Sequence, residues 1–372
     1  MIVKSHQFLN QLYFDLCQKW GAPDHQCQAF SEAILTGDLL GHVAQGNVIA
    51  QIADLMVSHN QINLTVEPEI EKETGSFAVM NGHHGLGQYV MKKATEKAIE
   101  IARKNTIGIV WVHDWHDIGC ASAFTRLALK ENMFCMLTVN SVPLTAPYGG
   151  RDMVMSAAPL AFACPAKRNL PVLGDMALCQ TYDYYFNLAI HNNEKLPGKW
   201  LIDPETGELT DDPRPFVDDP AHRSSGVRVA TVFQDPKLYV VNILSELLTG
   251  LLTPGGWTSN LHEYPSRDYL QRGIDVKRGG GGFILVVDPA QLMPFDHFLD
   301  RVDNWIDVIK GGGLQKGFQE ILVPGERALK EEQKRLASGV PVLPDQWAKL
   351  CEMSEKAGID IEALEARISA GS

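Results

Sequence analysis

The chain has 372 residues, of which 45% are hydrophobic and 21% charged, and these values are those of an ordinary globular protein. The length allows two domains, or one large core with additions, and the composition excludes disordered, collagen-like and coiled-coil proteins. Acidic residues outnumber basic ones by 45 to 33, which gives a net charge of −12. This sign argues against nucleic acid or an anionic membrane as the main partner.

The amino-terminal stretch MIVKSHQFLNQLYF lacks the apolar core of a signal peptide. The longest apolar-rich run, residues 241–257, contains Glu246 and is too short to cross a bilayer. Seven cysteines are scattered along the chain without a CxxC pair, which predicts reduced, mostly buried thiols and a cytoplasmic protein.

The amino-terminal region is predicted to be helical. Phe8, Leu12 and Leu16 share one face of a first helix, Pro23-Asp24 starts a second, and a third covers about 46–57. Beyond it, strands and helices alternate, a pattern typical of an α/β layered domain that by itself favours a parallel sheet. The predicted strands are 76–82, 107–113 and 134–140, and the predicted helices between them are 88–104 and 121–130.

The middle of the chain is rich in Pro, Gly, Asp and Tyr, and residues 196–227 are expected to form a long ordered loop. Short strands are expected at 160–165, 171–177 and 184–190, and a longer strand follows at 279–289. The remaining predicted elements are helices at 237–252, 295–310, 325–337 and 344–356.

Two motifs hold most of the polar chemistry. NGHHGLGQ (81–88) does not fit GxGxxG and is interpreted as a glycine turn before a helix, whose amino terminus could hold a phosphate. HDWHDIG (113–119) lies between a buried strand and a helix, where sites in α/β proteins form. A catalytic or cofactor contact is favoured there over a solvated turn or a metal site, since neighbouring residues of an extended chain point to opposite faces. His42 is expected to be a hydrogen-bonded structural residue.

Several segments together resemble the malate/L-lactate dehydrogenase family of the sulfolactate dehydrogenase type, from about residue 10 to 360. The segments are NGHHGLGQYV, IGIVWVHDWHDIGCASAF, TVNSVPLTAPYGG, GDMAL, LPGKWLIDPETGELTDDP and ILVPGERALK. The family also holds ureidoglycolate dehydrogenase, diketogulonate reductase and ketimine reductases. The resemblance implies an α/β, non-Rossmann fold with a largely antiparallel sheet, binding of NAD or NADP, a small-molecule substrate, and a homodimer with its active site near the interface.

The resemblance also implies a division of the chain. Residues 126–289 would form the nicotinamide-cofactor-binding domain, and residues 1–125 with 290–372 a helix-rich α/β domain with helices from both termini. The residues that match cofactor-contacting positions of the family are Ser141, Asp175, Met176, Ala177, Ala121, Gly325 and Glu326.

Three positions with chemical roles in the family are changed in this chain. Ala44-Gln45-Gly46 stands where the family has Ser-His-Gly, Asp117 stands where it places a catalytic His, and Phe233-Gln234 replaces a Lys-Gly. A positioned acid–base group contributes about 10²–10⁴-fold in rate, so these changes matter. Gln45 can orient a substrate but cannot carry a proton. Asp117 suits the stabilisation of a protonated imine, and His116 could take over the proton.

The leading hypothesis is therefore an NAD(P)H-dependent oxidoreductase of a small 2-oxo or 2-imino acid, with Asp117, His116 and Gln45 as its catalytic residues and no metal. Two alternatives stay open. One is a family relative without redox turnover, which binds a nucleotide or performs a non-redox reaction. The other is a metal-dependent hydrolase that uses the cluster at 113–117.

Overall fold

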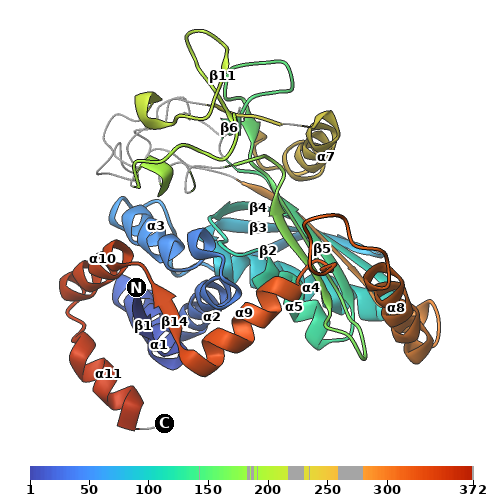
Figure 1. Cartoon of the computed structure of the whole chain (residues 1–372). Coiled ribbons are helices and arrows are strands. Elements are labelled where there is room, and N and C mark those ends of the chain that lie inside the picture. The colour runs from blue at the N-terminus through green and yellow to red at the C-terminus, as the bar shows by residue number, and fades with distance from the viewer. Residues whose placement is uncertain are drawn as a thin grey trace.

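The fold is that of a computed structural model, and it is described for residues 1–141, 143–181, 185, 188–190, 192–216, 230–233, 235–258 and 280–370. Its central layer is a seven-stranded sheet in the order β2-β3-β4-β13-β5-β8-β9 (Figure 1). The strands are β2 (Glu69–Thr74), β3 (Phe77–Leu86), β4 (Ile107–His116), β5 (Phe134–Val139), β8 (Pro159–Cys164), β9 (Val172–Ala177) and β13 (Gly281–Val287).

The sheet is mixed and mostly antiparallel. β3 and β4 run parallel, whereas β13 pairs antiparallel with both β4 and β5, and β8 pairs antiparallel with both β5 and β9. The largely antiparallel α/β fold is thus confirmed, and the parallel sheet suggested by strand–helix alternation is wrong. The cause is β13, which enters from the last third of the chain and separates β4 from β5, the two strands that helix α5 connects.

Two helices cover one face of the sheet. α4 (Gly87–Asn105) turns Met91, Ala94 and Ala98 into the main core, where they join β-strand residues such as Val110 and Ile284. α5 (Ser122–Lys130) packs beside it on β5 and β8. Both helices follow the predicted apolar periodicity, which is what buries their faces against the sheet.

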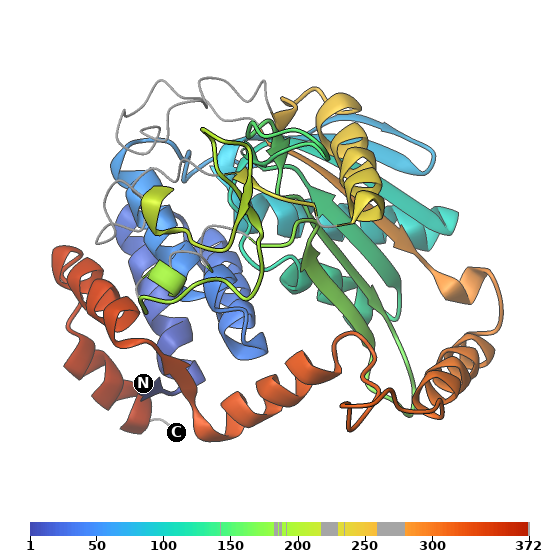
Figure 2. The same ribbon diagram turned by 45° about the horizontal axis from the view of Figure 1, so that its top comes forward.

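A separate helical layer is built from both ends of the chain. α1 (His6–Trp20), α2 (Asp24–Leu40) and α3 (Asn47–Ser58) share a core with α10 (Pro344–Lys356) and α11 (Ile361–Ala370), and β1 (Ile2–Lys4) pairs with β14 (Val340–Val342). Figures 1 and 2 both show the two termini on the side of the molecule that this layer forms. α9 (Glu326–Ser338) runs from it to the loop that follows α8 (Phe295–Lys310) (Figure 2).

Above the sheet lies a five-stranded sheet in the order β11-β10-β12-β6-β7, beside α7 (Pro236–Glu246) and a π-helical turn (Leu247–Leu251). Its strands are β6 (Pro143–Thr145), β7 (Met155–Ser156), β10 (Leu201–Ile202), β11 (Leu209–Thr210) and β12 (Ala230–Thr231). The long loop expected at 196–227 therefore contains a short hairpin, β10–β11, and its residues 217–227 lie outside the described part.

The strand predicted at 184–190 is wrong, because Tyr185 and residues 188–190 are helical and the others lie outside the described residues. The division into 1–125 with 290–372 and 126–289 stays a prediction. The seven-stranded sheet takes β2, β3 and β4 from the first part and β5, β8, β9 and β13 from the second.

Candidate active site

Several polar residues that the sequence analysis identified as candidates lie at one end of the central sheet. Because β3 and β4 are parallel and β13 is antiparallel to β4 and β5, the carboxyl ends of β3, β4 and β5 meet the amino end of β13. Gly281 pairs with His113, and Asn140, just after β5, accepts a hydrogen bond at Oδ1 from the Gly281 N–H at 2.8 Å. At this end β4 stops at His116 and β5 stops at Val139, two residues before Ser141.

The glycine-rich segment 81–88 is not the turn that the sequence predicts. β3 continues through it, and its register with β4 shifts between Asn81 and Gly85, which marks a β-bulge. Gly87 begins α4, and a Cβ atom there would lie 1.5 Å from the carbonyl oxygen of His116. A Cβ atom on Gly82 would lie 2.6 Å from the carbonyl oxygen of Asp114. The glycines therefore let β3 approach the backbone of β4 closely.

His113 is buried between two carboxylates. Its Nδ1 lies 2.9 Å from Asp114 Oδ2, and its Nε2 lies 2.9 Å from Glu71 Oε2 on β2. Burial lowers the pKa of His113, but these hydrogen bonds raise it more, so the net pKa is raised. Within the described residues there is no group of three or more His, Cys, Asp or Glu placed to hold a metal ion. Glu71 was not predicted from the sequence, since nothing local links it to His113.

His116 and Asp117 occupy different environments although they are neighbours. His116, the last residue of β4, is 3% exposed, and its ring centroid lies 5.7 Å from that of His84. Asp117 is exposed, and its Oδ1 accepts a hydrogen bond from the Gly119 N–H at 2.9 Å. The two neighbours are thus separated by the fold, with the His116 ring inside and the Asp117 carboxylate at the surface.

Gln45 lies beside the turn that follows β4. It ends a 3-10 turn (Val43–Gln45), and a Cβ atom on Gly119 would be only 3.1 Å from the Gln45 carbonyl oxygen. His42 Nδ1 lies 3.2 Å from Gln45 Oε1, in agreement with the structural role expected for His42. Gln45 and the turn that follows β4 are thus brought together from separate parts of the chain.

A buried carboxylate fixes the backbone next to Gln45. Asp38 is 1% exposed, and its Oδ2 accepts the Tyr13 hydroxyl at 2.5 Å. Its Oδ1 accepts the backbone N–H and the side-chain amide of Asn47, at 2.9 and 3.0 Å. Burial raises the pKa of Asp38, whereas these hydrogen bonds and the charge of Arg335 oppose the rise. Asp38 was missed by the sequence analysis, because a lone Asp in a helix carries no local signal.

Asp175 and Ala121, two predicted cofactor positions, meet at the start of α5. Asp175 Oδ2 on β9 accepts the Ser122 N–H at 2.7 Å, directly after Ala121. Burial raises the pKa of the adjacent Cys120 thiol well above its usual range, and the Asp175 charge adds to the effect. Asp175 Oδ1 is buried and has no hydrogen-bond partner among the described residues. A buried acceptor of this kind fits a ligand that donates a hydrogen bond, as the amide or hydroxyl groups of a nicotinamide nucleotide do.

The other predicted cofactor positions are more dispersed. Met176 is exposed and Ala177 half-buried on the same edge strand as Asp175, whereas Ser141 follows β5 and bonds through its backbone N–H to Ser156 Oγ at 2.8 Å. The structure does not bring Ser141 into hydrogen-bond contact with Asp175. Phe233 is buried, and Gln234 lies outside the described residues.

Gly325 and Glu326 begin α9 beside β9. Gly325 has φ +98°, and a Cβ atom there would lie 2.7 Å from the Cβ atom of Leu173. Both oxygens of Glu326 accept hydrogen bonds from Lys310 Nζ, at 2.6 and 2.7 Å. Glu326 is therefore tied to α8, and Gly325 is required by the close contact with β9.

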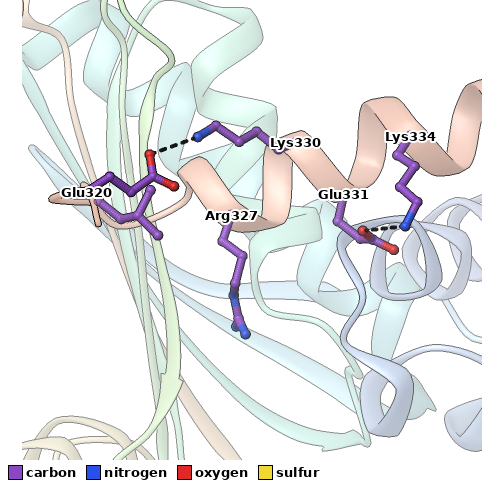
Figure 3. Close-up of a pocket in the computed structure, with 6 residues that line it drawn as sticks. Glu320, Arg327, Lys330, Glu331 and Lys334 are labelled. Carbon is purple, nitrogen blue, oxygen red and sulfur yellow. Dashed lines mark hydrogen bonds and ion pairs between the residues drawn. The ribbon is translucent and has the colours of Figure 1, made fainter. Parts of the chain in front are cut away.

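A cavity of about 270 Å³ lies one turn further along α9 (Figure 3). Its charges are largely paired, Lys330 with Glu320 at 3.5 Å and Lys334 with Glu331 at 3.8 Å. Figure 3 shows the Arg327 side chain extending away from both ion pairs. The cavity is lined by Glu320, Leu322, Arg327, Lys330, Glu331 and Lys334, and none of the predicted site residues is among them.

Comparison with solved structures defines the class of fold. The chain superimposes on sulfolactate dehydrogenase from Methanocaldococcus jannaschii with a TM-score of 0.85 and 24% identity, over 97% of this chain and 99% of that one. The sulfolactate dehydrogenase-like fold predicted from the sequence is thereby confirmed. No helix in the described part of the chain has the length and apolar character needed to cross a membrane.

The sequence places the chain in a family. Residues 5–351 match the profile described as Malate/L-lactate dehydrogenase, and the chain belongs to this family. It is similar to malate dehydrogenase from Pyrococcus abyssi, with 27% identity over 92% of this chain and 91% of that protein. It is also similar to L-sulfolactate dehydrogenase from M. jannaschii, with 26% identity over 95% and 96%. Members of the family are NAD(P)-dependent dehydrogenases of 2-hydroxy acids.

Proposed function

We propose that this protein is an NAD(P)H-dependent oxidoreductase that reduces a small 2-oxo or 2-imino acid. The main support is the position of Gln45, which lies against the turn Asp117–Gly119 at the end of β4. The chain also matches a dehydrogenase family along almost its whole length. The buried, unpartnered Oδ1 of Asp175 supports binding of the nucleotide near the start of α5.

In the proposed reaction each residue has one task. A bound reduced nicotinamide would supply a hydride to the substrate α-carbon. Gln45, whose Oε1 faces His42, orients the substrate with its amide. The exposed Asp117 carboxylate stabilises the positive charge of a protonated imine, and His116 supplies a proton to the oxygen of a 2-oxo acid.

Steady-state oxidation of NADH and NADPH tests this function. A panel of 2-oxo acids, alone and with ammonia or methylamine, and of cyclic 2-imino acids is expected to contain at least one substrate. Asp117→Asn is expected to lower kcat/KM for the imine substrate about 10-fold or more, because the carboxylate no longer stabilises the iminium charge. Asp296→Asn, on the surface of α8, is the matched control and is expected to keep wild-type activity.

Full activity of Asp117→Asn would contradict the role of that carboxylate. A protein that binds NAD(P)H in a fluorescence titration and oxidises it with no member of the panel would instead be the relative without redox turnover, and the proposed function would be wrong.

We further propose that α7 mediates formation of a homodimer. Unlike an ordinary surface helix, α7 turns polar side chains inward. Asn242 donates to the Ser156 carbonyl oxygen at 3.0 Å, and the Ser245 hydroxyl lies 2.5 Å from Thr138 Oγ1. Its apolar residues face outward at the spacing of one helix face, with Val240 64% and Leu244 53% exposed. Exposed apolar faces of this kind mark protein contacts. The exposed set is Val240, Ile243, Leu244, Leu247 and Leu251.

Leu244→Glu is expected to convert the dimer to a monomer, because a carboxylate in the centre of an apolar interface loses its hydration. Light scattering after gel filtration measures the mass. Leu292→Glu, an equally exposed leucine outside α7, is the control and is expected to leave the dimer intact. A wild-type protein that is monomeric at micromolar concentration would contradict the proposed dimer.

A further inference from the structure

Two imidazoles lie side by side at the carboxyl ends of the parallel strands β3 and β4. The ring centroids of His84 and His116 are 5.7 Å apart, and the ring planes are inclined by 40°. His116 is buried and His84 is half-buried. Because the His116 ring is buried, water has little access to it after it gives up a proton. His84 lies next to it and is partly exposed, so His84 can take a proton from water and pass it to His116.

The backbone is distorted where it presents His84. His83 and His84 have φ values of 49° and 57°, in the left-handed region that residues other than glycine rarely adopt. Both lie in the bulge between Asn81 and Gly85, where β3 changes its register with β4. Backbone strain of this kind is concentrated at functional sites. In β3 without the bulge, side chains would alternate in direction, so the bulge determines which way His84 points.

Several acidic residues on β2 and β4 lie near the pair. Asp114 follows His113 on β4, and its pKa is lowered, against a desolvation effect, by His113 and by the charges of His84 and His83. On β2, Glu69 Oε2 lies 3.1 Å from His83 Nε2, and Glu71 binds His113. Asp117 follows His116 directly. The carboxylates of Glu69 and Glu71 thus bind the histidines that flank the pair, His83 and His113.

We propose that His84 and His116 form a proton relay, a proposal that rests on the proposed function. A bound reduced nicotinamide would supply a hydride, with its electron pair, to the α-carbon of the 2-oxo acid and would itself be oxidised. The carbonyl π electrons move to the oxygen, which takes a proton from the His116 imidazolium. His116 then takes a proton from His84, and His84 takes one from water. The 2-oxo acid is thereby reduced to the 2-hydroxy acid.

Asparagine substitutions test the relay, because asparagine tolerates positive φ and cannot carry a proton. His116→Asn is expected to lower kcat for the 2-oxo acid about 100-fold and His84→Asn at least about 10-fold, with KM nearly unchanged. His83→Asn is the matched control: it adjoins His84, has the same backbone conformation and faces Glu69 instead, and it is expected to keep wild-type kcat.

A second readout is independent of turnover. In the cofactor-free protein with ¹³C-labelled histidine, the NMR titration midpoint of His116 is expected to move to higher pH in His84→Asn, since a neighbouring positive charge is removed. His83→Asn is expected to move it far less. A structural role for His84 would not predict this shift.

The outcomes separate the relay from the proposed function. If the wild type reduces a 2-oxo acid but His84→Asn keeps full kcat, or if the His116 midpoint does not change, the relay is wrong and the function stands. If the wild type oxidises NAD(P)H with no substrate, the function and the hydride-coupled relay are both overturned.

Discussion

Gly87→Ala is expected to lower the free energy of unfolding by about 3 kcal/mol and to abolish activity, because overpacking of this severity forces the backbone to move. An added Cβ atom would lie 1.5 Å from the His116 carbonyl oxygen and 2.4 Å from that of Asp117. Neither atom belongs to a flexible side chain, so α4 must shift away from the end of β4. The same shift would break the bond from Gln88 Nε2 to the Asp117 carbonyl, now 2.9 Å.

Urea unfolding followed by circular dichroism measures the loss of stability. Gly313→Ala is the control, because a Cβ atom there has no atom within 4 Å and the backbone φ is ordinary. This variant is expected to stay within about 0.5 kcal/mol of the wild type. A Gly87→Ala protein as stable as Gly313→Ala would show that β3 and α4 do not approach β4 as closely as described.

Asp38→Ala is expected to lower the free energy of unfolding by about 3–4 kcal/mol. It leaves the Tyr13 hydroxyl and both Asn47 donors without an acceptor in a buried site, and each such group costs about 1–3 kcal/mol. Since Asn47 begins α3, two residues after Gln45, the variant is also expected to lose activity.

Two milder variants test this explanation by urea unfolding. Asp38→Asn keeps a carbonyl for Asn47, and its amide can donate to the Tyr13 oxygen, so it is expected to cost less than half as much as the alanine. Tyr13→Phe removes one hydrogen bond and is expected to cost about 1 kcal/mol. Equal losses for Asp38→Asn and Asp38→Ala would contradict the role given to the hydrogen bonds.

Local sequence patterns predicted most elements but not their pairing. The helices at 88–104 and 344–356 agree closely with α4 and α10, because their apolar periodicity spans many residues. The strand predicted at 184–190 failed because a short apolar run rich in Tyr and Phe fits a strand or a buried helix equally well. The parallel direction predicted for the sheet was wrong because β13 lies between β4 and β5. That position depends on contacts between residues more than 140 positions apart in the sequence, such as the hydrogen bond between Asn140 and Gly281.

The candidate site was predictable only in part for the same reason. The sequence pointed to His116 and Asp117 as a dense polar cluster, and the family resemblance added Gln45. It gave no indication that His84 lies beside His116 or that Glu71 binds His113, because both contacts depend on strand pairing and on a bulge. The doubled histidine at 83–84 was the available signal for the former.

The central position of β13 has a consequence for synthesis on the ribosome. β4 and β5 are complete by residue 139, yet the strand that joins them begins at Gly281. While the intervening residues are translated, both strands have an unpaired edge, and such edges promote association between chains. We therefore expect these two edges to stay open to contacts with other chains until β13 has emerged from the exit tunnel.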